Sequence, residues 1–163
     1  MTMPESLKNI GMITDAVWND VDGDKDPDLL VVGEWTTIRL FRNDKGKLTD
    51  ISKDAGLGGT SGLWKRIEAG DFNNDGRMDF VVGNMGLNSR LEAKSGEPLT
   101  LIFNDFDKNG QPEQILCRYN EGKLLPYVLR GDMMSNLPFL KKKYLRYDQY
   151  AGKTIEDIFT PEQ

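Results

Sequence analysis

The amino-acid sequence predicts a mainly β protein that ends in a short helical tail. Three acidic, glycine-containing loops share one internal spacing, and a short apolar run follows each of them. Apolar runs of this length, bounded by turn residues, are typical of buried strands. Beyond about residue 131 the apolar residues adopt a helical spacing. We therefore expect a β domain over residues 1–131 and a helical tail or insertion over residues 132–163.

The first loop spans Asp20–Asp28, the second Asp71–Asp79 and the third Asp105–Glu113. Each carries an oxygen-bearing side chain at loop positions 1, 3, 5 and 9, and a glycine at position 4 or 6 permits a sharp backbone turn. The residues that we expect to contribute metal ligands, through a side chain or a backbone carbonyl, are Asp20, Asp22, Asp24, Asp26, Asp28, Asp71, Asn73, Asp75, Arg77, Asp79, Asp105, Asp107, Asn109, Gln111 and Glu113.

This pattern of oxygen atoms suits calcium, a hard cation that takes six to eight oxygen ligands. Alternate side chains of a tight loop can point at one centre, while position 7 (Asp26, Arg77 or Gln111) offers its backbone carbonyl. Position 9 supplies the closing carboxylate. Because carboxylates this close together repel one another unless a cation lies among them, we expect Ca²⁺ as the cofactor.

The loops are not EF-hands. That motif requires a bidentate glutamate at position 12 and flanking helices, whereas position 12 here is Val31, Val82 or Leu116. Apolar, β-branched runs follow instead, over residues 29–33, 80–83 and 115–117. We therefore expect each loop to connect strands and to be anchored in a sheet.

Five further elements follow from local patterns. They are a strand over residues 36–43 with a turn at Asn43–Gly46, a strand over 100–103, a hairpin over 119–124, an amphipathic helix over 138–150 opened by Pro138, and a capped helical turn at Thr154–Asp157.

Composition excludes several functions. The chain has no histidine, which removes catalytic triads that depend on it and most zinc chemistry, and its single cysteine, Cys117, allows no intrachain disulfide. The net charge of −5 disfavours nucleic acid as a partner, and Lys141–Lys143 with Arg146 are better explained as a solvated helix face than as a nucleic-acid patch. We expect no membrane span, because the longest apolar run is Leu29–Val32, and no secretion signal is visible at the start of the chain.

Residues 70–84, around the second loop, resemble the FG-GAP/VCBS-type repeats, whose β-propeller blades carry integrin-α-like calcium loops. Residues 40–51 and 54–57 are similar to the ASPIC branch of cartilage-acidic-protein-like sequences, and the whole resemblance covers about residues 12–120. The resemblance implies four-stranded blades, calcium held between strands, an extracytoplasmic location, and a role in binding, adhesion or scaffolding. The fold that we expect is thus a partial β-propeller of about three blades with a helical tail.

Three blades are too few for a closed propeller, which needs four to eight. The missing neighbours would come from the remaining blades of a parent protein, from self-association, or from the tail folding over an apolar face. We favour a portion of a larger propeller, acting as a binding, adhesion or scaffold module with a protein or glycan ligand.

The alternative function is part of a carbohydrate-active enzyme, a glycoside hydrolase or lyase, with catalytic residues outside this chain. The acids outside the loops, such as Asp44, Asp54 and Glu68, show no spacing that marks a catalytic pair. We therefore expect no enzymatic activity. The tryptophans (Trp18, Trp35 and Trp64) are expected to pack in the core in preference to forming a sugar-stacking platform.

Overall fold

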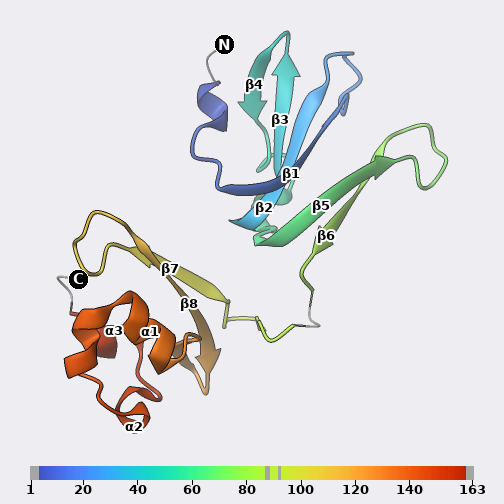
Figure 1. The fold of residues 1–163 in the computed structure, drawn as a ribbon. Coiled ribbons are helices and arrows are strands. Elements are labelled where there is room, and N and C mark those ends of the chain that lie inside the picture. The colour runs from blue at the N-terminus through green and yellow to red at the C-terminus, as the bar shows by residue number, and fades with distance from the viewer. Residues whose placement is uncertain (1–3, 87–88, 92, 161–163) are drawn as a thin grey trace. The chain divides into compact units, whose positions relative to one another are not determined.

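The computed structural model describes residues 4–86, 89–91 and 93–160, so the outermost residues of both expected domains (1–3 and 161–163) lie outside the described part. Within that part, nine strands form two antiparallel sheets and the helices are few and short (Figure 1). The mainly β fold class is confirmed, and it is consistent with a partial β-propeller built of repeats.

The chain divides into two compact units, Met1–Asn88 and Ser89–Gln163. The boundary expected at residue 131 falls inside the second unit. The assignment of residues 1–131 to repeat blades stays a prediction, because sequence repeats and compact units divide the chain in different ways.

The first unit contains a six-stranded sheet and two single-turn 3₁₀ helices. Its elements are η1 (Glu5–Leu7), β1 (Met12–Asn19), β2 (Asp28–Thr36), β3 (Arg39–Asp44), β4 (Lys47–Asp50), η2 (Leu57–Gly59), β5 (Gly62–Gly70) and β6 (Asp79–Asn84).

Strands β1 to β4 form a meander in which each strand pairs with the next one in the chain, as in a four-stranded propeller blade. Both faces of β2 are buried, since Leu30 and Val32 belong to one apolar cluster and Leu29 and Val31 to another. This confirms the strand expected over residues 29–33. The hairpin turn expected at Asn43–Gly46 is also confirmed: Asp44 pairs with Lys47, and the two residues between them, Lys45 and Gly46, have positive φ.

The β5–β6 hairpin joins the same sheet at the end of β2, and Asp15 of β1 reinforces this junction. The Asp15 carboxylate accepts hydrogen bonds from the backbone N–H of Ile67 (3.0 Å) and of Ala16 (2.9 Å). These two bonds, the one from Ile67 foremost, hold the pKa of Asp15 below its ordinary value. The ionised carboxylate therefore links the first meander to the next hairpin.

The second unit pairs a three-stranded sheet with the helical tail. Its elements are β7 (Thr100–Asn104), β8 (Glu113–Asn120), β9 (Lys123–Pro126), α1 (Arg130–Asn136), η3 (Pro138–Lys142), α2 (Tyr147–Tyr150) and α3 (Ile155–Ile158). The strand expected over residues 100–103 and the hairpin expected over 119–124 are confirmed.

The tail covers one face of this sheet. Ile115 and Cys117 of β8 lie in one apolar cluster with Leu137, Leu140 and other tail residues, all of them buried. Three ways to cover an apolar blade face were left open by the sequence. One of them, folding of the tail over that face, is present within the second unit.

The prediction of a single helix over residues 138–150 is wrong. The structure has a 3₁₀ helix (η3) and a separate short helix (α2) in that region, and α1 precedes them. Tertiary contacts lie at the break. Arg130 donates to the backbone carbonyls of Tyr144 (2.8 Å) and Leu145 (2.9 Å), which a continuous helix would pair internally. The side chains of Lys143 and Tyr144 donate to carbonyls of α3 and hold this segment against it. The capped turn at Thr154–Asp157 is confirmed by a reciprocal capping box.

The tryptophans differ in their surroundings. Trp64 packs against the core of the first unit and donates its ring N–H to the Thr60 carbonyl (2.7 Å), whereas Trp18 is 54% exposed. Core packing therefore accounts for Trp64 and not for Trp18. No helix in the described part of the chain is long and apolar enough to cross a membrane.

A close backbone approach at Gly33 yields a test of the sheet. A Cβ atom at Gly33 would lie 2.2 Å from the Met12 carbonyl oxygen, beside an irregularity in the β1–β2 pairing. We expect Gly33→Ala to lower the free energy of unfolding by about 2 kcal/mol, because backbone must shift to relieve the overlap. Gly59→Ala is the matched control, since nothing lies within 4 Å of a Cβ atom there. Equal stability of the two variants in urea unfolding would contradict the β1–β2 register.

Candidate metal centres

Each acidic loop joins two consecutive antiparallel strands. The first loop connects β1 to β2, the second connects β5 to β6, and the third connects β7 to β8. In all three cases position 9 (Asp28, Asp79 or Glu113) is the first residue of the following strand. The expectation that the loops connect strands is confirmed.

The carboxylate at position 9 closes each loop. It accepts a hydrogen bond from the backbone N–H at position 2, over 3.0 Å in the first loop, 3.1 Å in the second and 2.9 Å in the third. The bond joins the two ends of the loop where the strand pairing begins.

The carboxylate at position 1 is held by two backbone N–H groups, one on each oxygen. The donors are at positions 4 and 6 in the first loop (2.7 and 3.0 Å), and at positions 5 and 6 in the second (3.1 and 2.9 Å) and third (2.9 and 2.8 Å). The oxygen at position 3 accepts from the N–H at position 5, and that at position 5 accepts from position 7, in every loop. One network therefore occurs three times.

The backbone at positions 4 and 6 makes this network possible. Both residues have positive φ in every loop, although only one of the two is glycine; the residues are Gly23 and Lys25, Asn74 and Gly76, and Lys108 and Gly110. Left-handed residues at these positions turn successive N–H groups toward the inside of the loop. The glycine expected at position 4 or 6 thus does serve the turn, with a second left-handed residue beside it.

The side chains at positions 1, 3 and 9 converge in the first and third loops. Oxygen atoms of Asp20, Asp22 and Asp28 lie within 4.8 Å of one another, and so do those of Asp105, Asp107 and Glu113. Ligand oxygens about 2.4 Å from a calcium ion are separated by comparable distances, so both groups fit this ion. In the second loop, position 3 is Asn73, whose amide oxygen is also a calcium ligand type.

The structure does not bring every expected ligand into these groups. Asp24, at position 5, is not part of the converging carboxylates of the first loop. Asp26, at position 7, directs its carboxylate to the backbone N–H of Lys45 (2.9 Å), which agrees with the expectation that its side chain points elsewhere. Coordination by the position 5 oxygens and by the position 7 carbonyls stays a prediction.

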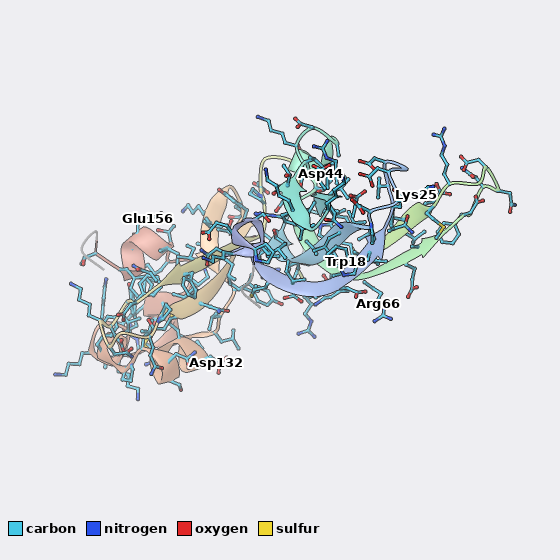
Figure 2. All side chains as sticks on the ribbon, turned by 90° about the horizontal axis from the view of Figure 1, so that it is seen from above. Trp18, Lys25, Asp44, Arg66, Asp132 and Glu156 are labelled. Atoms are coloured by element: carbon cyan, nitrogen blue, oxygen red, sulfur yellow. The ribbon has the colours of Figure 1, made fainter. Side chains whose placement is uncertain are left out.

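The first loop has a second support that the sequence pattern did not reveal. Asp28 is only 2% exposed. The second oxygen of its carboxylate accepts a hydrogen bond from the backbone N–H of Asn43 (2.8 Å). The Asn43 amide donates in turn to the Pro27 carbonyl (2.8 Å). Figure 2 labels Lys25 in this loop and Asp44, which follows Asn43 at the end of β3. No local signal in the sequence marks this contact, because 15 residues separate Asp28 from Asn43.

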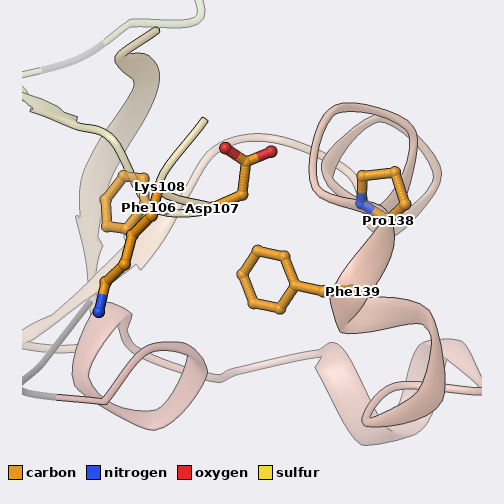
Figure 3. Close-up of a pocket in the computed structure, with 5 residues that line it drawn as sticks. All are labelled: Phe106, Asp107, Lys108, Pro138 and Phe139. Atoms are coloured by element: carbon orange, nitrogen blue, oxygen red, sulfur yellow. The ribbon is translucent and has the colours of Figure 1, made fainter. Parts of the chain in front are cut away.

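The third loop borders an open hollow of about 420 Å³. Figure 3 shows the Asp107 carboxylate and the Phe139 ring facing the same space, with Pro138 on its far side. Phe139 is 40% exposed. Position 3 of this loop is therefore accessible to solvent, and water could complete the coordination of an ion held there.

Comparison with known proteins agrees with this geometry. Residues 20–82 match the model of the FG-GAP-like repeat family, a segment that starts at position 1 of the first loop and ends within β6. No curated protein and no solved structure matches the chain. The matched segment contains the first and second loops, and the third loop, outside it, repeats the same hydrogen bonds.

The roles of positions 7 and 9 can be separated in the second loop. We expect Asp79→Ala to weaken calcium binding at this loop at least tenfold, because a charged ligand is lost, and Arg77→Ala to change it less than twofold. Asp79→Asn, which keeps an acceptor for the Phe72 N–H, isolates the effect of the charge. Titration calorimetry measures the affinity and the number of sites. Equal losses in Asp79→Ala and Arg77→Ala would show that the ligand positions are misassigned.

Proposed function

We propose that this chain is a calcium-binding segment of a β-propeller-type repeat protein and that it acts as a binding, adhesion or scaffold module. The observation that carries the proposal is the hydrogen-bond network that recurs in all three loops, together with the convergence of carboxylate oxygens at positions 1, 3 and 9 in the first and third loops. The match of residues 20–82 to the FG-GAP-like repeat supports it.

Calcium would have a structural role here. The loop carboxylates use backbone N–H groups for some of their lone pairs, and the oxygens that converge still face one another. An ion bound among them would remove the repulsion and fix the two strands that each loop connects. Three calcium ions carry six positive charges, which outweigh the net charge of −5.

The proposal extends to family branch, location and ligand. The chain belongs to the VCBS or ASPIC branch, is extracytoplasmic and binds a protein or glycan ligand. The remaining blades come from a parent protein or from self-association. We also propose that the chain is not itself an enzyme, because the acids of the loops serve as metal ligands and the chain has no histidine.

Thermal unfolding tests the proposed calcium dependence. Sites with a dissociation constant near 10⁻⁴ M would contribute about 1.4 kcal/mol each at roughly 1 mM calcium, so the Tm should rise by several degrees. Magnesium at the same concentration should raise it less, because this smaller ion prefers a strict octahedral geometry and retains its waters. A Tm that is the same in excess chelator and in millimolar calcium would refute the proposal.

A further inference from the structure

The second unit contains a recess that is separate from the acidic loops. It has a volume of about 280 Å³, and we call it the basic recess. Its walls come from the β8–β9 pair, the segment before α1, the start of α1, and α2 with the turn that follows (Figure 1). The residues that matter here are Arg118, Tyr127, Arg130, Tyr147, Tyr150 and Lys153.

The charge of the basic recess contrasts with that of the chain. Arg118, Arg130 and Lys153 line it, and no acidic residue is among the described residues that do so. The chain as a whole carries a net charge of −5, and its acids are concentrated in the loops. Three cations around one small cavity favour a negatively charged ligand.

The two arginines are held in place. Arg130 donates from Nε to the Tyr144 carbonyl (2.8 Å) and from Nη2 to the Leu145 carbonyl (2.9 Å), so its guanidinium is fixed while Nη1 has further donors. The Arg118 guanidinium lies over the Tyr127 ring, 4.9 Å from its centroid. A cation that is already ordered loses less side-chain entropy when it binds a ligand.

The aromatic walls of the basic recess differ in how they are held. The Tyr150 hydroxyl donates to the Val128 carbonyl (2.9 Å), and burial foremost raises the pKa of Tyr150 to about 12, so this wall stays uncharged. Tyr147 is 61% exposed, although the Arg130 guanidinium lies over its ring, 5.6 Å from the centroid. An exposed tyrosine ring offers an apolar face to the C–H groups of a sugar.

We propose that the basic recess binds the carboxylate or sulfate group of an acidic sugar residue. Guanidinium groups pair with planar carboxylates and with tetrahedral sulfate groups through two parallel hydrogen bonds, and Lys153 adds a third charge. The cavity is at the small end of ligand pockets and suits a single sugar ring. A nucleic acid fits less well, because it requires an extended basic track that an acidic chain does not offer.

This inference gives a ligand class to the binding role proposed above, but the residues that carry it include none of the loop residues. The two proposals can therefore fail independently. A rise of the Tm with calcium, measured on the same preparations, reports on the loops and not on the basic recess.

An NMR titration of the full chain in calcium tests the basic recess. The probes are a trisaccharide of galacturonic acid, a sulfated galactose trisaccharide, the neutral galactose trisaccharide and a tyrosine-phosphorylated peptide. We expect saturable shifts of the backbone amides of Tyr127, Leu129 and Gly152 with an acidic probe, and none with the neutral one. The two acidic probes distinguish the carboxylate from the sulfate as the preferred group.

Variants of exposed residues link the binding to the basic recess. Arg118→Ala and Lys153→Ala should each weaken binding at least tenfold, whereas Lys141→Ala, an exposed lysine outside the recess that removes the same charge, should change it less than twofold. Arg130 is left intact because it holds the tail. Equal losses in all three variants would show a diffuse charge effect and overturn the proposal. So would saturation by the neutral trisaccharide, preferential binding of a tyrosine-phosphorylated peptide, or no shift with any probe up to about 10 mM.

Discussion

One hydrogen bond recurs in each repeat, and the rest of the structure depends on it: the carboxylate at position 9 accepts from the backbone N–H at position 2. Position 9 is also the first residue of a strand, so the bond fixes where the sheet pairing starts. It therefore couples a loop of repelling charges to an apolar strand whose burial stabilises the unit. In the first loop the coupling is strongest, because Asp28 is buried and its second oxygen reaches the neighbouring turn at Asn43.

The same bond explains why acidic residues can be so dense. Every carboxylate at positions 1 and 9 has at least one backbone donor, and the left-handed residue at position 6 donates its N–H to position 1 in all three loops. Backbone dipoles offset part of the repulsion, and in the first and third loops the side chains at positions 1, 3 and 9 remain directed at a common centre. The loop is thus ordered by its own backbone and still presents a concentrated negative charge, which is the combination that a hard cation requires.

Local patterns in the sequence predicted the parts of the structure that local forces determine. The spacing of Asp71, Asn73 and Asp79 was sufficient to place the second loop between strands, because the network that holds it joins residues no more than seven apart. The second left-handed position could not be predicted, since Lys25 and Lys108 carry no signal for positive φ. The prediction of one continuous helix in the tail was wrong for a different reason. The helical spacing was present, but the backbone carbonyls of Tyr144 and Leu145 accept from Arg130, and such long-range contacts leave no trace in a local pattern.

The third loop shows how the repeat separates two roles. It makes the same bonds as the first and second loops, yet its strands lie in a three-stranded sheet that helices cover, where the first unit has a six-stranded sheet. A network confined to nine residues can be placed in either setting without change. The surroundings, in contrast, differ between the units, and the basic recess exists only because the tail folds against β8 and β9. The loops are therefore suited to a constant task, holding an ion that stabilises the sheet, while recognition of a ligand depends on the segments added around them.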